Sequence, residues 1–341
     1  MREVSTIGLD IAKQVFHVHA ADRQGAMVLS KKIARSKLLS FFASQPPCLV
    51  ALEACGGAHH WGRELARLGH DVRLIPPAYV KPFVKRQKND ALDAEAICEA
   101  AQRPGMRFVS VKTEAQQANA LLFRARDLFV RQRTQIVNAL RGHMAEFGWV
   151  APKGLQHARD LRALVENPAS ELLPAARSML AAMLGTLTML DEQIAQLDRE
   201  ITRRSREDDV ARRLMTIPGV GPITAVALAA LAPPLEGFAR GRDFAAWLGL
   251  TPRQHSTGGR QRLGSITKMG ERTLRRLLII GSTAVVRQAR RLGIRKNPWL
   301  TQMIERKPPM LVAVALANKM ARIIWAVMTR HENYRAPVAI A

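Results

Sequence analysis

Short strand-like runs near the amino terminus constrain the fold of this chain more than any other feature. Three β-branched or alternating runs, separated by turn-like breaks, occupy residues 4–10, 14–21 and 26–33. They predict a three-stranded antiparallel meander. A fourth apolar run, Cys48 to Leu52, leads into a helical stretch from His59 to Leu68, and a fifth strand, Asp71 to Ile75, follows. This order of elements predicts an α/β domain.

Four acidic residues lie where these elements begin or end. Asp10 ends the first strand, and Glu53 stands at the carboxyl end of the fourth. In an open α/β sheet, residues at the carboxyl ends of adjacent strands share one crevice. Asp90 and Asp93 open the next helix, and their i, i+3 spacing puts both side chains on one helical face, about 5–6 Å apart at Cβ. We therefore expect all four carboxylates to form one cluster.

Clustered carboxylates repel one another and lose hydration, so divalent cations stabilise them. Hard oxygen ligands favour Mg²⁺ or Mn²⁺ over zinc. Two such ions about 3.5–4 Å apart can clamp the attacking and leaving oxygens of a phosphodiester. The alternative is purely structural: Asp10 and Glu53 cap turns, while Asp90 and Asp93 stabilise a helix amino terminus.

The charge of the chain indicates a polyanionic partner. Fifty-two Lys and Arg against 28 Asp and Glu give a net charge of +24, in a chain that is 48% hydrophobic. A folded protein with such a surface binds phosphate backbones in a strongly salt-dependent way. Aromatic residues make up only 5%, so base stacking is not expected to dominate.

Membrane binding and metal sites made of cysteine are not expected. The chain shows no basic amphipathic amino terminus, lipidation signal or signal peptide. Its apolar stretches at 214–238 and 311–328 are interrupted by Pro, Gly or polar residues. We expect a cytoplasmic protein. The three cysteines have no CxxC spacing, which predicts reduced thiols without a structural zinc site.

The middle of the chain is helical and basic. Residues from Thr113 to about Phe147 form one helical stretch, and the 148–178 segment reverses the chain or links two helices. A heptad seam then runs through Leu180, Met183, Leu187, Leu190, Ile194, Leu197 and Ile201. Such a seam suits an antiparallel helix pair or a coiled coil between subunits, and we expect dimerisation through this region. An ordinary bundle helix within one protomer is the alternative.

The carboxyl-terminal part begins with LMTIPGVGPITAVALAALA, which predicts two helices joined by a Gly-Val-Gly turn. In such elements, glycines let backbone N–H groups approach a phosphate at the next helix amino terminus. Gly219 and Gly221 are therefore candidate nucleic-acid contacts. The alternative is a tight turn between packed helices.

A basic loop, LTPRQHSTGGRQRLGSITKMGERTLRR, contains a candidate nucleophile. Ser256 stands among cations that can hold a phosphate, namely Arg253, Arg260, Arg262 and Lys268. A serine needs a base or a metal ion to attack a phosphate. His255 is adjacent, but neighbouring side chains in an extended loop point apart. A phosphate-positioning segment with an incidental hydroxyl is the alternative.

Five long blocks, in order and over nearly the whole chain, carry a family resemblance. They are GLDIAK, ALEACGGAHHWGREL, VRLIPPAYVKPFVKRQKNDALDAEAICEA, IPGVGPITA and GLTPRQHSTGGRQRLGSITKMGERTLRRLL. Together they resemble the IS-one-ten family of insertion-sequence transposases, a group that includes the Piv DNA invertases.

The resemblance implies three domains. It implies a RuvC-like domain of the ribonuclease H fold at 1–108, a helical coiled-coil connector at 109–205, and a mainly helical transposase domain at 206–335. The family's four-acid metal site maps onto Asp10, Glu53, Asp90 and Asp93, and its nucleophilic serine maps onto Ser256. Ser265 and Thr257 offer alternative hydroxyls, and His255 has no assigned role.

The same resemblance implies activity and partners. A serine attack on a scissile DNA phosphate would form a covalent phosphoserine link, supported by Mg²⁺ or Mn²⁺ at the acids. Donor DNA, target DNA and a noncoding guide RNA encoded by the element would be the partners of a homodimer or homotetramer. A metal-dependent Holliday-junction-type nuclease that uses water, and a non-catalytic DNA-binding protein, are the competing functions.

Overall fold

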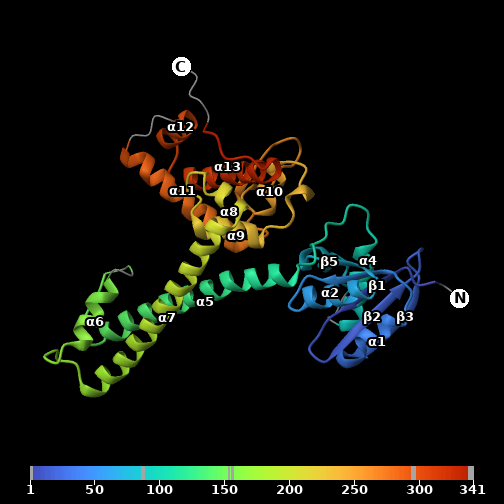
Figure 1. Ribbon diagram of the computed structural model, residues 1–341, viewed down its shortest axis with the longest axis horizontal. Coiled ribbons are helices and arrows are strands. Elements are labelled where there is room, and N and C mark those ends of the chain that lie inside the picture. Colours follow the sequence, from blue (N-terminus) through green and yellow to red (C-terminus); the bar gives the residue numbers. More distant parts are fainter. Residues whose placement is uncertain (1–2, 86–88, 153, 155–156, 293–296, 337–341) are drawn as a thin grey trace. The chain divides into compact units, whose positions relative to one another are not determined.

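The computed structural model describes residues 3–85, 89–152, 154, 157–292 and 297–336. The chain divides into two compact units, Met1–Gln117 and Ala118–Ala341 (Figure 1). The first unit is mixed α/β and the second is mainly helical, so the predicted combination of an α/β part with an α part is confirmed.

The first unit is built on a five-stranded sheet of order β3-β2-β1-β4-β5. Its strands are β1 (Thr6–Asp10), β2 (Val15–Ala21), β3 (Met27–Ala34), β4 (Leu49–Glu53) and β5 (Asp71–Ile75). The pairs β1–β2 and β2–β3 are antiparallel, whereas β1–β4 and β4–β5 are parallel. The predicted meander and both later strands are therefore confirmed, and Asp10 and Glu53 end their strands as expected.

Helices cover both faces of this sheet. Side chains alternate between the two faces of a strand, so Ile7 and Leu9 on β1 share a face with Val50 and Leu52 on β4. The helices α1 (Leu38–Ala43) and α2 (Ala58–Arg67) add Phe42, Trp61 and Leu65 to this apolar layer. The other face packs against α4 (Asp90–Ala101). Short elements complete the unit: η1 (Arg35–Lys37), α3 (Pro77–Val80) and η2 (Lys81–Phe83).

Two long helices run antiparallel to each other in the second unit. These are α5 (Glu114–Ala145), whose first turn belongs to the first unit, and α7 (Pro174–Glu207). Arg126 on α5 pairs with Asp198 on α7, and Arg133 pairs with Asp191, with Nη–Oδ distances of 3.1 Å in both pairs. Seven residues forward on α5 thus correspond to seven residues back on α7. This register is that of an antiparallel pair.

The predicted heptad seam is buried within a single chain. Most of its members on α7 are at most 5% exposed, namely Leu180, Leu187, Leu190, Ile194 and Ile201. Leu180 and Leu187 pack in one cluster with Val137 and Leu140 of α5 and with residues of α6 (Ala158–Glu166). The seam therefore serves the antiparallel pairing within the chain, and α6 lies in the segment expected to link the two long helices.

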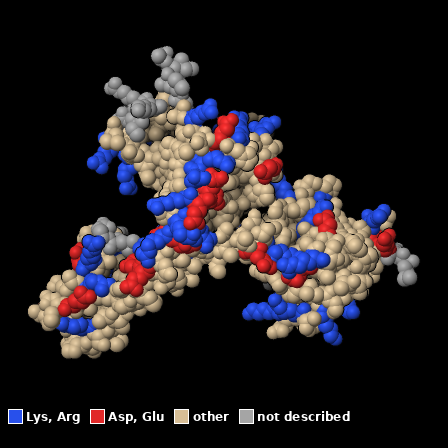
Figure 2. Space-filling model, viewed as in Figure 1, with Lys and Arg blue, Asp and Glu red and all other residues tan. Residues whose placement is uncertain are grey.

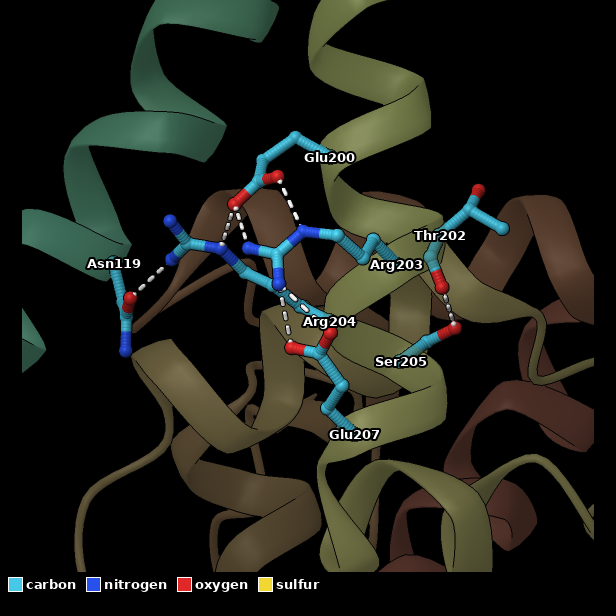
Figure 3. A network of polar contacts seen from close by, with 7 residues as sticks. All are labelled: Asn119, Glu200, Thr202, Arg203, Arg204, Ser205 and Glu207. Carbon is cyan, nitrogen blue, oxygen red and sulfur yellow. Dashed lines mark hydrogen bonds and ion pairs between the residues drawn. The ribbon is translucent and has the colours of Figure 1, made fainter.

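A polar network fixes the carboxyl end of α7 to α5 (Figure 3). Arg203 and Arg204 both donate to Glu200, at 2.8 and 2.7 Å, and Arg203 also donates to Glu207 at 2.7 Å. Arg204 reaches across to the Asn119 side-chain oxygen on α5. Because Arg203 and Arg204 each have two side-chain acceptors, both guanidinium groups are held in place.

The rest of the second unit forms one apolar core. Its elements are α8 (Asp209–Leu214), α9 (Pro222–Leu231), η4 (Leu235–Gly237), α10 (Gly241–Trp247), β6 (Pro252–Gln254), β7 (Leu263–Ile266), α11 (Arg272–Leu292), α12 (Pro298–Arg306) and α13 (Pro309–Arg330). The predicted helix–turn–helix around the Gly-Val-Gly sequence is confirmed as α8 and α9.

In the described part of the chain, α13 alone is long and apolar enough to cross a membrane. It packs against α10 and α11, and Val312, Ala317 and Ile324 are fully buried, as in a core helix.

Candidate active site

The register of the parallel pair β1–β4 brings the first two acids together. Leu9 pairs with Leu52, so Asp10 and Glu53 are the next residues on two adjacent strands. Both lie on the face that α4 covers, because they alternate with the apolar residues of the opposite layer. The strand ends therefore position Asp10 and Glu53 side by side, as the sequence predicts.

Helix α4 adds the other two acids. Asn89 caps this helix: its side-chain oxygen accepts the N–H of Ala91 at 3.1 Å. Asp90 and Asp93 then occupy the first turn. One ligand oxygen each from Asp10, Asp90 and Asp93 lie within 4.8 Å of one another. Three carboxylates thus form a group that can hold a metal ion, and Glu53 stands beside it on β4.

Gly8 allows α4 to lie this close to the sheet. It is two residues before Asp10 on the same face of β1. A Cβ at this position would come 2.2 Å from the Ala94 carbonyl oxygen and 2.6 Å from the Cys98 nitrogen. Only glycine permits that approach, which carries the first turn of α4 to Asp10.

The electrostatics of the cluster favour a bound cation. Burial first, and then the neighbouring carboxylates Asp93, Asp90 and Glu53, raise the pKa of Asp10 from 3.8 to about 6. The backbone N–H of Ile11 acts in the opposite direction. A carboxylate in such surroundings binds protons and cations more readily than an ordinary aspartate. The donor set consists of carboxylate oxygens, which suit a hard divalent cation.

His17 also faces this cluster, and the sequence interpretation did not include it. It is the register partner of Asp10 on β2, it is 7% exposed, and its Nε2 lies 3.7 Å from Oδ2 of Asp90. The signal was present in the sequence. A tight antiparallel pairing of the first two strands puts the HVH segment opposite the strand end that carries Asp10.

The candidate nucleophile Ser256 lies in the predicted loop, and the structure shows that this loop connects the strands β6 and β7 of a β-hairpin. Strands β6 and β7 pair antiparallel, and the Arg260 N–H donates to the Thr257 carbonyl at 3.0 Å across the tip. Gly258 and Gly259 form the turn with φ of +55° and +76°. Two successive residues with positive φ are the conformation of a tight hairpin turn, which glycine adopts most easily. The Gly-Gly pair thus explains why the segment folds back on itself.

Ser256 is exposed near the tip of this hairpin. Its Oγ accepts the backbone N–H of Arg262 at 3.3 Å. The His255 ring lies near Gly264, where an added Cβ would come 3.5 Å from its Cδ2. The His255 N–H donates to the Arg262 carbonyl at 2.8 Å, and neighbouring side chains in such an extended segment point apart, so His255 is badly placed as a base for Ser256. Ser265 is exposed on β7, farther along the chain from the tip.

The predicted cations are exposed on the same segment. Arg253, Arg260, Arg262 and Lys268 all lie on the hairpin or just after it and face solvent. Figure 2 shows further Lys and Arg side chains on the visible faces of both units, where acidic residues interrupt them along α7. The hairpin therefore offers both a hydroxyl and positive charge to a phosphate.

The base of the hairpin is closely packed and hydrogen-bonded. A Cβ at Gly270 would come 1.7 Å from the Trp247 carbonyl oxygen, and one at Gly249 would come 2.2 Å from that of Met269. The Arg275 guanidinium, which is 9% exposed, donates to the carbonyls of Leu248 and Met269 at 2.9 and 2.7 Å. One buried side chain of α11 thus joins the two ends of the hairpin segment.

The structure gives the two candidate turn glycines different surroundings. Gly219 has φ of +87°, and an added Cβ would come 2.9 Å from the Gly281 carbonyl oxygen on α11. Its missing side chain therefore serves packing between helices. Gly221 is exposed and is the N-cap of α9, with no atom within 4 Å of an added Cβ. Of the two, Gly221 has the surroundings that leave room for a phosphate.

Comparison with known proteins agrees with this arrangement. Residues 7–148 match the family model DEDD_Tnp_IS110, described as a transposase, and residues 211–296 match the Transposase IS116/IS110/IS902 family. A probable family 20 transposase of Pseudomonas aeruginosa is 49% identical over 97% of this chain and 99% of the relative. The chain belongs to the IS116/IS110/IS902 family of transposases.

Two further relatives belong to named insertion sequences. The transposase for insertion sequence element IS1328 of Yersinia enterocolitica is 42% identical over 97% of this chain and 98% of that protein. The transposase for IS1111A of Coxiella burnetii is 38% identical over 98% and 92%. The resemblance seen in the sequence motifs is thus confirmed, and membership of this family indicates an enzyme that cuts and rejoins DNA.

Both regions of interest lie within the matched parts of this transposase. The four acids fall in residues 7–148, whose family name carries the term DEDD, and Ser256 falls in residues 211–296. The family name and the acidic group together suggest a divalent metal.

Proposed function

We propose that this chain is a transposase and site-specific DNA recombinase that uses a Mg²⁺-binding DEDD cluster and a serine nucleophile. The observation that carries the proposal is the cluster itself: three carboxylates with ligand oxygens within 4.8 Å of one another, in a chain of the transposase family. Such a group, in which the pKa of Asp10 is about 6, favours a bound cation over three free negative charges.

Asp10, Glu53, Asp90 and Asp93 would hold Mg²⁺ or Mn²⁺. The residues fit, since all four offer carboxylate oxygens and three of them already converge. When bound, the metal supplies Lewis-acid stabilisation of charge at the attacking and leaving oxygens of a phosphodiester.

Ser256 would be the nucleophile in a transesterification. Its Oγ loses a proton and bonds to the scissile phosphorus, while the bond from phosphorus to one deoxyribose oxygen breaks and that oxygen takes up a proton. A second attack by a DNA hydroxyl reverses the step and rejoins the strands. The exposed position of Ser256 among arginines supports access to a phosphate.

The partners would be donor DNA, target DNA and an element-encoded guide RNA. A net charge of +24 supports a protein that holds more than one nucleic acid. By resemblance to the family, we also propose that the acid cluster of one subunit and the serine of another complete one site in a homodimer or homotetramer.

The domain assignment forms part of the same proposal. The strand order β3-β2-β1-β4-β5, with an antiparallel meander followed by parallel strands, supports a RuvC-like ribonuclease H fold at 1–108. The antiparallel pair of α5 and α7 supports a coiled-coil connector within 109–205, and the helical core around the hairpin supports a transposase domain at 206–335.

Recombination assays with matched variants test the proposal. Using protein co-expressed with its whole element, Asp10→Ala and Ser256→Ala should each abolish strand exchange while leaving salt-sensitive DNA binding unchanged. Ser265→Ala, which removes one of the alternative hydroxyls on the hairpin, should retain activity. Metal-dependent cleavage that survives in Ser256→Ala would instead indicate a junction nuclease that uses water. DNA binding by the unmodified protein and all variants, with no cleavage by any of them, would indicate a binding protein.

A further inference from the structure

We propose that His17 is a positioning residue of the metal site, where it orients the Asp90 carboxylate toward the cation. The inference rests on the proposed metal-binding function of the acid cluster. It adds a ring nitrogen beside a site that is otherwise described by carboxylates alone.

Strand pairing places the ring. His17 on β2 is the register partner of Asp10 on β1, and β1 is paired with β4, whose last residue is Glu53. These three residues therefore lie side by side on three neighbouring strands, where β1 and β4 end. Helix α4 packs over β1 and β2 and brings Asp90 above His17, with 3.7 Å between Nε2 and Oδ2.

Burial makes His17 the better-fixed member of this pair. Only 9% of its side chain is exposed, against 59% of the Asp90 side chain. The Asp90 side chain is largely exposed, so its surroundings leave its rotamer free to change. The His17 ring is enclosed between the sheet and α4, which fixes its orientation. A fixed ring nitrogen that faces the carboxylate therefore restrains it, as second-shell partners do for metal ligands in general.

The charges of the cluster give such a group a role. Asp90 stands among other carboxylates, which repel it and favour rotation toward solvent. The 3.7 Å between Nε2 and Oδ2 is longer than a hydrogen bond, so the His17 ring opposes that rotation as a facing polar group and leaves the oxygen lone pairs for the cation. His17 thus reduces the ordering that metal binding must impose on the free protein.

Metal binding by the whole chain tests the inference without relying on activity. The probe is Mn²⁺ alone, titrated into metal-free protein and followed by electron paramagnetic resonance. Loss of a second-shell partner commonly lowers metal affinity by about 10–100-fold, and we expect a decrease of that size in His17→Ala. His17→Gln should remain within about threefold of the unmodified chain, because its amide nitrogen lies near the position of Nε2.

Two further variants separate positioning from packing. His17→Asn fills space, but its amide nitrogen corresponds to Nδ1 and does not reach Asp90, so its affinity should fall as in the alanine variant. His19→Ala removes the next ring on the same face of β2, which interacts with Glu95 and Lys85, and should leave Mn²⁺ affinity unchanged. If His17→Ala does not fold, the comparison of His17→Gln with His17→Asn still shows whether His17 positions Asp90 or only fills space.

The outcomes distinguish this inference from the proposed function. If the unmodified chain binds Mn²⁺ in a way that Asp10→Asn abolishes, but all His17 variants bind equally, the role of His17 is wrong and the metal site stands. If the unmodified chain binds no Mn²⁺, both the site and the role of His17 are wrong.

Discussion

Gly8 on β1 lies so close to Ala94 on α4 that a Cβ added to Gly8 would come 2.2 Å from the Ala94 carbonyl oxygen. This contact sets the distance between the sheet and the helix that carries Asp90 and Asp93. The geometry of the acid cluster therefore depends on a residue that has no side chain.

Replacing Gly8 by alanine should push α4 away from the sheet. Overpacking of this kind costs about 1–3 kcal/mol of the free energy of unfolding, and Mn²⁺ affinity should fall because Asp93 moves away from Asp10. Urea unfolding and Mn²⁺ titration measure the two effects. Gly185→Ala, in the helix α7 with open space around it, is the matched control and should lower neither the free energy of unfolding nor the Mn²⁺ affinity. Unchanged metal affinity in a folded Gly8→Ala protein would contradict this account.

The raised pKa of Asp10 makes a prediction about pH. The pKa is about 6 in the folded chain, against an ordinary value of 3.8. The folded state therefore holds this proton more tightly than the unfolded state, and its contribution to stability is largest below pH 3.8 and is lost as the pH rises through about 6. In EDTA, the stability of the unmodified chain relative to Asp10→Asn should fall between pH 5 and about pH 7.

Urea unfolding of both proteins across that pH range measures this difference. Added Mn²⁺ should reverse the loss at pH 7 in the unmodified chain, since the cation replaces the proton, and should have no effect on Asp10→Asn. A stability difference between the two proteins that is independent of pH would show that Asp10 is not in the environment described.

Arg275 makes a prediction about the serine hairpin. Its guanidinium joins the Leu248 and Met269 carbonyls at the two ends of the segment that carries Ser256. Arg275→Met leaves two carbonyls without this donor, which should destabilise the second unit by about 2–4 kcal/mol and loosen the hairpin. Amide hydrogen exchange of residues 250–268 measures the loosening. The exposed neighbour Arg272→Met is the control, and equal exchange in both variants would contradict the role of Arg275.

The cations of the hairpin make a prediction about salt dependence. If Arg260 and Arg262 each contact one phosphate, each alanine variant should reduce the slope of log K against log salt by about one, with similar losses on all DNA sequences. Fluorescence anisotropy at several salt concentrations measures the slope. Gln261→Ala, an uncharged neighbour on the same turn, should leave it unchanged. Slopes that stay the same in the arginine variants would place the DNA elsewhere.

Local patterns in the sequence were sufficient for most elements of the fold. The alternating runs that end at Asp10 and Ala21, the apolar run before Glu53 and the helix that begins at Asp90 all lie within a few residues of their predicted bounds. In each of these segments, turn residues or a capping residue mark the ends, so the signal is contained within a few neighbouring positions.

The sequence interpretation missed features that depend on contacts between distant segments. Three such contacts each join separate elements of the chain. Gly8 lies against Ala94, His17 faces Asp90, and the Arg275 guanidinium donates to the Leu248 carbonyl. The sequence predicts the loop that contains Ser256 but not the two strands that flank it, because β6 and β7 are short and exposed, without the alternation that identifies a half-buried strand. The Gly258-Gly259 pair was the signal that favoured a hairpin.

The most direct test of the central claim is a search for a covalent bond between Ser256 and DNA. Protein co-expressed with its whole element is incubated with labelled element-junction DNA and Mg²⁺, resolved on a denaturing gel, and digested for mass spectrometry of the adduct. We predict a DNA-linked peptide with the phosphate on Ser256, absent from Ser256→Ala and from Asp10→Ala, and retained in Ser265→Ala. Strand cleavage that is equal in the unmodified and Ser256→Ala proteins, without any adduct, would contradict the account and assign the acid cluster to a hydrolytic nuclease.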